Sequence, residues 1–260
     1  GAVLSFVDLT EANQAILVAN GGTNGGDGGQ IVIGEVARAP KAHFKIYGNG
    51  SLDVSGRIRP GLRAGSLEGD GLVFLGGQKL ALGSSNVNTT FSGTIMDGSI
   101  VNGVGGSLIK LGPGSLELSG ANTYTGGTIV KSGVLRVTNT MGSGTGSGLV
   151  TVEAGVLAGS GIIAGAITLG TSSDSFATIA PSNGMGRSAL LTTQDALTFN
   201  STGVYKWTVR KDQATADELI ANSVTISVGA LFSGDSVGTG NLSLNMVFTA
   251  INITSPVQIN

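Results

Sequence analysis

Two patterns in the sequence contain residues that could support nucleophilic catalysis by serine. His43 is the only histidine, so it is the only imidazole that could act as a general base. Residues 234–238 (G-D-S-V-G) have the letters of the G-x-S-x-G nucleophile elbow, which requires a helix after it and a histidine later in the chain. No helical pattern follows, and His43 lies far before Ser236 rather than after it. We therefore interpret residues 234–238 as a glycine-rich turn and His43 as a surface residue near the start of a strand.

A third pattern, residues 107–110 (S-L-I-K), matches the S-x-x-K motif of penicillin-binding enzymes. That motif opens a helix and is accompanied by S-D-N and K-T-G motifs, which this sequence lacks. The alternation of apolar and polar residues here predicts a strand instead. We interpret the match as a coincidence.

Acidic side chains could cleave a glycan if two carboxylates lay about 5–10 Å apart on one face. Asp53, Asp70 and Asp97 do not share the repeat spacing described below, and Asp53 is expected to face glycine-rich positions rather than another acid. A polysaccharide-degrading enzyme therefore stays an alternative without a defined site. The densest acidic group has no basic or aromatic platform beside it and comprises Asp212, Asp217 and Glu218.

Two further segments could bind ligands. Tyr205 and Trp207 could stack on a sugar, but we expect them to form the apolar body and edge of a terminal cap. Residues 25–29 (G-G-D-G-G) resemble a single copy of a calcium-binding glycine-rich repeat, whereas such sites need tandem copies to supply six to eight oxygen ligands. We assign no catalytic, cofactor-binding or metal-ligating residue, and we expect no cofactor.

The composition narrows the class of protein. The 260 residues include 45 glycines and no cysteine, and 12% are charged, against about 7% glycine and roughly 25% charged residues in an average domain. A hydrophobic fraction of 40% is enough for a core. With a net charge of −2 and no basic block, we expect no nucleic-acid partner. No apolar run approaches the roughly 20 residues that span a bilayer, so we expect no membrane insertion by this segment itself.

A regular repeat organises the chain. Seven of the glycines recur at intervals of 21, 21, 22, 21, 19 and 22 residues, and an aliphatic side chain stands two positions after each of the seven. Such a period predicts one supersecondary unit per repeat. The glycines are Gly29, Gly50, Gly71, Gly93, Gly114, Gly133 and Gly155, and the aliphatic residues are Ile31, Leu52, Val73, Ile95, Leu116, Leu135 and Leu157.

Between the glycines the sequence predicts short strands. Residues 116–118 (L-E-L) and 135–137 (L-R-V) place a charge between two aliphatic residues, which is the period-two pattern of a half-buried strand. No long helix is predicted. Residues 9–20 and 215–221 could each hold at most one or two helical turns.

These features predict an all-β fold, a parallel β-helix (β-solenoid) with about 21 residues per coil. About twelve coils, with strands about 4.8 Å apart, would form a rod about 55–60 Å long. A β-sandwich with glycine-rich turns is the alternative. We expect regular coils over residues 1–160 and, over 161–260, a continuation of the solenoid that ends in a looser sheet-like cap, with a loop at 181–187 and strands at 224–228 and 242–246. The two parts are expected to form one continuous domain.

Residues 114–127 read G-S-L-E-L-S-G-A-N-T-Y-T-G-G and are followed by T-I-V-K-S-G-V-L. This stretch closely resembles the autotransporter-associated β-strand repeat, which occurs in the passenger regions of type V secreted proteins. Residues 89–95 resemble the segment that commonly precedes the repeat, and 157–163 and 179–183 the stretch that follows it. Residues 217–219 (D-E-L), which stand before a further predicted strand, also fit the arrangement of this family. The resemblance covers roughly residues 48–250.

The resemblance implies a right-handed β-helix, display outside the cell or at the outer membrane of a Gram-negative-type bacterium, and often an adhesive role. It also implies a part in folding outside the cell, for which the stacking of each coil on the one before offers a physical reason. The strand pattern of the family's carboxy-terminal membrane barrel is not recognised in this sequence. Both a chain that stops short of a barrel and a freestanding secreted relative stay open.

We therefore predict a non-enzymatic, exported structural module of the passenger type. The alternatives are a subunit of a self-assembling extracellular filament, a glycan-binding adhesin and a polysaccharide-degrading enzyme. The expected partners are further copies of the chain, or a glycan or protein of a host or cell surface.

Overall fold

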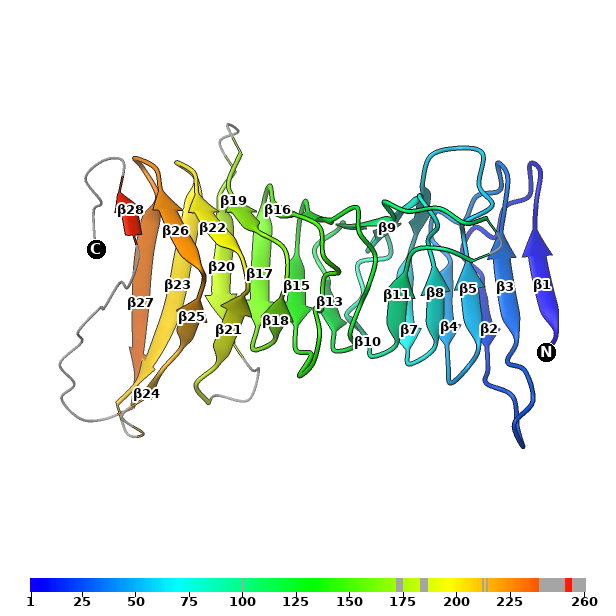
Figure 1. Cartoon of the computed structure of the whole chain (residues 1–260), viewed down its shortest axis with the longest axis horizontal. Coiled ribbons are helices and arrows are strands. Elements are labelled where there is room, and N and C mark those ends of the chain that lie inside the picture. The colour runs from blue at the N-terminus through cyan, green and yellow to red at the C-terminus, as the bar shows by residue number, and fades with distance from the viewer. Residues whose placement is uncertain are drawn as a thin grey trace.

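The structure is a computed structural model that describes residues 1–99, 101–171, 175–182, 187–211, 213, 215–238 and the backbone of 251–253. It is all-β, and short strands stack along one axis, with β1 (Val3–Phe6) at one end and β27 (Leu231–Val237) at the other (Figure 1). The parallel sheets form a β-solenoid of about ten turns, in which equivalent strands lie about 23 residues apart. The predicted solenoid is confirmed. Its turns are slightly longer and fewer than the spacing of the glycines suggested.

The described strands form four sheets in which almost every pair is parallel. From β5 (Ser51–Asp53) on, the chain passes from the first or fourth sheet to the third and then to the second, although some turns have no strand in the first or fourth sheet. The first sheet contains β1 (Val3–Phe6), β3 (Gln30–Ile33), β5 (Ser51–Asp53), β8 (Leu72–Phe74) and β11 (Thr94–Met96). The third contains β6 (Leu62–Ala64), β9 (Lys79–Leu82), β12 (Ser107–Lys110), β14 (Thr128–Val130), β16 (Val150–Val152), β19 (Ile167–Leu169), β22 (Ala196–Phe199), β26 (Ser223–Ile226) and β28 (Ile251–Ile253).

The second sheet runs the length of the solenoid, and the fourth occupies its C-terminal part. The second contains β2 (Ile16–Ala19), β4 (His43–Ile46), β7 (Ser66–Gly69), β10 (Thr89–Phe91), β13 (Ser115–Leu118), β15 (Val134–Val137), β17 (Gly155–Gly159), β20 (Ala177–Pro181), β23 (Gly203–Arg210), β24 (Thr215–Ala216) and β27 (Leu231–Val237). The fourth contains β18 (Ile162–Ile163), β21 (Leu190–Thr193) and β25 (Glu218–Ile220).

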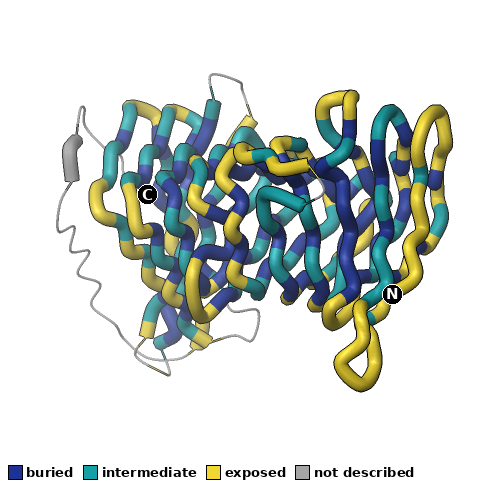
Figure 2. Tube along the Cα trace, turned by 45° about the vertical axis from the view of Figure 1, so that its right-hand side comes forward, coloured by how far each residue is buried: buried dark blue, intermediate teal, exposed yellow. Residues whose placement is uncertain are grey.

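The core consists of columns of inward side chains, one residue per turn. Ile31, Leu52, Val73 and Ile95 lie opposite one another on successive strands, and all four are fully buried. Alternate residues of the strands point outward, as Figure 2 shows by the alternation of buried and exposed positions along the trace. Burying a row of aliphatic side chains in this way is the main favourable contribution to folding.

The spacing of the glycines does not follow a single column. Leu116 does not stack on Ile95; it lies in the second sheet, where it pairs with Leu135 and Thr89. Residues 97–106 lengthen this turn, so Thr89 and Leu116 are partners although more than one average turn of chain separates them. The aliphatic residues that follow the seven glycines therefore do not form one column. The spacing of about 21 residues continues beyond Ile95 because the second sheet has an aliphatic column of its own, to which Leu116 and Leu135 belong.

After β11, hydrogen bonds from irregular segments replace the first sheet. The backbone N–H of Thr123 donates to the carbonyl of Ile95 at 2.9 Å, and that of Asn122 donates to Ser143 at 2.7 Å. The N–H of Gly144 then donates to Ile162, the first residue of β18. The face of the first sheet thus continues through residues 122–123 and 143–144 into the fourth sheet.

The C-terminal part contains the longest described strands, the eight-residue β23 and the seven-residue β27. Residues 9–20 and 215–221 contain no helix in their described part; they contribute β2, β24 and β25. Pro181 ends β20, and the rest of the predicted loop lies partly outside the described residues. Asp212 and the predicted strand at 242–246 also lie outside them. In the described part of the chain there is no helix with the length and apolar character needed to cross a membrane.

Candidate binding groove

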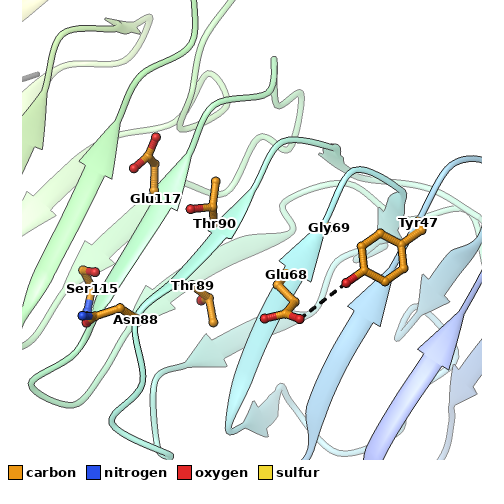
Figure 3. A pocket seen from close by; sticks show the side chains of 8 residues that line it. All are labelled: Tyr47, Glu68, Gly69, Asn88, Thr89, Thr90, Ser115 and Glu117. Carbon is orange, nitrogen blue, oxygen red and sulfur yellow. Dashed lines mark hydrogen bonds between the residues drawn. The ribbon is translucent and has the colours of Figure 1, made fainter. Parts of the chain in front are cut away.

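A shallow polar groove of about 360 Å³ lies on the outer face of the second sheet. It crosses the end of β4 and the strands β7, β10 and β13 (Figure 3). Glu68 and Glu117 are its charged residues, and Tyr47 stands at one end. Small residues form the rest of the lining: Gly69, Thr89, Thr90 and Ser115, together with Asn88.

The strand register places the two carboxylates in one outward row. Gly69 pairs with Phe91, which sets Glu68 opposite Thr90, and Thr90 pairs directly with Glu117. Two strand spacings of about 4.8 Å therefore separate the backbones of Glu68 and Glu117, roughly 10 Å in all. The short side chain of Thr90 stands between them, and this leaves the middle of the row hollow.

Both carboxylates contact neighbouring side chains. Lys45 Nζ lies 2.7 Å from Glu68 Oε1, and this ion pair raises the pKa of Lys45. The hydroxyl of Tyr47 lies 3.5 Å from the same oxygen. On the other side of the groove, the hydroxyl of Thr138 donates to Glu117 Oε1 at 2.9 Å. Arg136 pairs with Glu117 in the register of β13 and β15, and its guanidinium donates to the carbonyl of Ser182.

Gly69, which lines the groove, has a backbone conformation that requires glycine. This residue has a φ of +112°, and a Cβ built on it would come within 2.0 Å of the carbonyl oxygen of Ile46. A larger residue here would strain the backbone and collide with β4. At the other side, the N–H of Ser115 donates to Asn88 Oδ1 at 2.8 Å, which fixes the loop that enters β13.

The spacing of the glycine repeat does not lead to this pair of acids, because two turns of unequal length separate Glu68 from Glu117. The pair was therefore not predicted from the sequence. The signal available in the sequence was the alternation of residues 116–118, which correctly predicts that Glu117 points outward.

The structure does not bring together the residues considered for nucleophilic catalysis: His43 lies in β4 and Ser236 in β27, far apart in the strand order of the second sheet. His43 Nδ1 lies 2.9 Å from the hydroxyl of Ser66, but Ser66 is buried at the start of β7. Residues 107–110 form β12, which confirms the predicted strand. Residues 234–237 lie in β27, so the prediction of a glycine-rich turn is wrong. A glycine is needed there because a Cβ at 234 would come within 2.6 Å of the Trp207 ring.

Lys110, the last residue of the S-x-x-K match, occupies an unusual position. It stands in the inward column between Leu82 and Val130 and is almost fully buried. Its ammonium group donates to the carbonyls of Leu111, Gly112 and Ser132 at 2.7–3.2 Å. Burial lowers its pKa to about 8. A lysine held in this way supports the corner of the turn.

The aspartates considered for glycan cleavage serve the backbone. Asp53 is fully buried beside Val32 and Phe74, not beside glycines as predicted, and it accepts from Ser55 N and Ser99 Oγ. Asp97 accepts from Gly105 N, Gly106 N and Thr125 Oγ1, and Asp70 from Gly48 N. These carboxylates fix corners and the 97–106 loop.

Asp217 belongs to a buried ion pair. Its Oδ1 lies 2.9 Å from Arg210 Nη1 and also accepts from Ala189 N, while Oδ2 accepts from Thr208 N. Glu218 is exposed in β25. Tyr205 and Trp207 pack against the core, with ring centroids 5.1 Å apart. Residues 25–29 lie in the connection between β2 and β3, and no cluster of potential metal ligands occurs in the described residues.

Comparison with known proteins identifies one segment. Residues 108–137 match the family model of the passenger-associated-transport-repeat. The resemblance to autotransporter passengers is confirmed. The match covers β12 to β15, so it contains one complete turn of the solenoid. No curated protein and no solved structure matches the chain.

The residues of this passenger-associated transport repeat bridge the gap at the end of the first sheet. Asn122 Oδ1 accepts from Ile95 N, and its amide donates to Gly144 O, so one side chain links three successive turns. Tyr124 is fully buried, and its hydroxyl lies 2.5 Å from Thr128 Oγ1. Gly127 has a φ of +91°, which favours glycine. The side chains of Asn122 and Tyr124 thus form hydrogen bonds within the solenoid.

Proposed function

We propose that this chain is a passenger-type solenoid that is exported from a Gram-negative bacterium and acts there as a structural and display module. The match at residues 108–137 carries this proposal. The physical argument is that the solenoid is assembled from contacts between adjacent turns, as the parallel pairing along each sheet indicates. Such a chain can add one turn after another as it emerges from a membrane.

The role is non-enzymatic in this proposal. The described aspartates that sequence patterns suggested for catalysis hold backbone amides or an arginine, and His43 contacts a buried serine. The groove carboxylates Glu68 and Glu117 are each engaged by a neighbouring side chain. A surface that is stable and regular suits display and spacing.

An export experiment tests the proposal. The 260-residue chain would be placed between a secretion signal and the membrane barrel of an autotransporter, and intact cells would be treated with protease. We expect the chain at the cell surface as a protease-resistant core. Tyr124→Ala, which removes a fully buried side chain, should leave surface fragments that are readily digested, whereas Tyr47→Ala on the exterior should not. Retention of the parent chain inside the cell would contradict the proposal.

A second candidate function is end-to-end association of the chain with further copies of itself. Leu4 stands in the same inward column as Ile31, yet it is 46% exposed while Ile31 is fully buried. Among the described strands, β1 pairs only with β3, and β2 only with β4. A free strand edge next to exposed apolar side chains favours pairing with another strand.

A further inference from the structure

The groove defined above differs from the surfaces of proteins that bind protein partners. Its eight lining residues, all within the described part of the chain, offer hydroxyls, carboxylates, an amide and one aromatic ring, and none has a purely aliphatic side chain. The buried centres of protein–protein interfaces are depleted in such charged and small polar residues. The lining favours a ligand rich in hydroxyl groups.

The charge of the row favours a neutral ligand. Lys45 and Arg136 stand at the two ends of the row, and Glu68 and Glu117 stand inside it, so the formal charges cancel. An acidic sugar placed over Thr90 would face two carboxylates at once. Like charges at this distance disfavour binding. An uncharged sugar would meet hydrogen-bond acceptors without that repulsion.

Each carboxylate keeps acceptor capacity after its contacts within the protein. An ionised carboxylate offers about four acceptor positions. Lys45 and Tyr47 approach one oxygen of Glu68, and Thr138 approaches one oxygen of Glu117. Vicinal hydroxyls of a sugar can donate to the remaining positions, and hydrogen bonds to charged acceptors are the stronger kind.

Tyr47 supplies the apolar surface that a sugar ring also needs. Its side chain is 38% exposed at the end of the groove, and its hydroxyl is turned toward Glu68 (Figure 3). The hydroxyl lies 3.5 Å from Glu68, so the ring stands beside the acid at the end of the groove. From Tyr47 to Glu117 the groove spans about three strand spacings, roughly 14 Å. This length suits a short oligosaccharide rather than a monosaccharide.

We propose that this groove is a saccharide-binding site for a short neutral oligosaccharide that lies along the solenoid axis across β7, β10 and β13. Glu68 and Glu117 accept hydrogen bonds from sugar hydroxyls, and Tyr47 packs against the face of a terminal ring. The proposal does not depend on the export route, because it rests on the groove alone.

Titration of the purified 260-residue chain with three neutral trisaccharides tests this site. The probes are cellotriose, maltotriose and triacetylchitotriose, with trigalacturonic acid as the acidic comparison, and binding is followed by NMR shifts of the protein and by calorimetry. We expect at least one neutral probe to bind with a Kd of about 1 mM, the range of a weak polar site. Trigalacturonic acid should bind more weakly than that probe.

Variants locate the site. Glu117→Gln and Tyr47→Ala should each weaken binding about tenfold, the factor that corresponds to about 1.4 kcal/mol. Glu153→Gln is the matched control, because Glu153 is a surface carboxylate paired with Lys131 at 3.2 Å, outside the groove. Thr90→Arg should abolish binding by filling the centre of the row. Thermal unfolding of each variant confirms that the fold is retained.

Four results would overturn the proposal. They are the absence of saturable binding by all three neutral probes, equal affinity in Glu117→Gln and Glu153→Gln, tighter binding of trigalacturonic acid, and release of new reducing ends. The last result would assign catalysis to the groove instead of binding. Failure of export would leave all four measurements unchanged, so the two proposals can fail separately.

Discussion

Asn122 Oδ1 accepts the backbone N–H of Ile95 at 2.8 Å, at the point where the first sheet would otherwise need another strand. A buried N–H without a partner would cost free energy. The side chain of Asn122 therefore replaces a strand at this position. It also donates to Gly144 O at 2.6 Å in the following turn. Asn122 lies within the matched segment 108–137, where the first sheet has ended.

Asn122→Ala should destabilise the protein. It would leave Ile95 N and Gly144 O buried without these partners, and we expect a loss of about 2–4 kcal/mol in the free energy of unfolding. Urea unfolding would measure it. Asn49→Ala is the matched control: Asn49 also links two backbone groups, Gly22 N and Gly26 O, but at an exposed loop, and should cost less than about 1 kcal/mol. Equal losses would contradict the assigned role.

The alternation of residues and the period of the chain predict the fold because inward columns require an aliphatic residue once per turn. The alternation and the period do not reveal to which sheet of the solenoid a strand belongs, since the strands of every sheet have the same alternation. Turn length also varies widely: the pairing of Val150 with Ile167 closes a short turn, and that of Ile167 with Leu197 a much longer one. The groove was missed for the same reason, because a turn of more than average length joins Thr90 to Glu117.

Lys110 could not be foreseen as an inward residue, because charged residues usually mark the outer face. Its burial should make stability depend on pH in the alkaline range. Burial holds its folded-state pKa at about 8, below the ordinary 10.5, so the unfolded chain binds more protons between these values. The contribution of Lys110 to the free energy of unfolding should therefore increase by roughly 2–3 kcal/mol as the pH rises from about 8 to 10.5. Below pH 8 this contribution should stay constant. The measurement is the difference in unfolding free energy between the parent protein and Lys110→Met at each pH.

Lys131→Met controls for loss of a lysine, because Lys131 is an exposed residue paired with Glu153. Its difference from the parent protein should not show the same rise between pH 8 and 10.5. A Lys110→Met difference that is flat across this range would show that the ammonium is not penalised by burial.

Asp217→Ala should act on stability rather than on any catalytic activity. Asp217 and Arg210 form a buried ion pair, and removal of the acid leaves the arginine, Ala189 N and Thr208 N without this partner. Loss of one member of such a pair costs about 3–5 kcal/mol. Thermal and urea unfolding would report the change, and Glu218→Ala is the exposed neighbour for comparison. Loss of glycan cleavage without loss of stability would instead support an enzyme.

Leu4 should control self-association of the 260-residue chain if the free edge of β1 pairs with a second copy. Light scattering should show a mass that grows with protein concentration, because pairing would bury Leu4 as its neighbour Ile31 is buried. Leu4→Lys places a charge in the inward column at this edge and should keep the chain monomeric. Leu9→Lys adds the same charge at a more exposed position outside the strands and should leave association unchanged. A constant monomeric mass for the parent chain, or equal behaviour of the two variants, would exclude association through this edge.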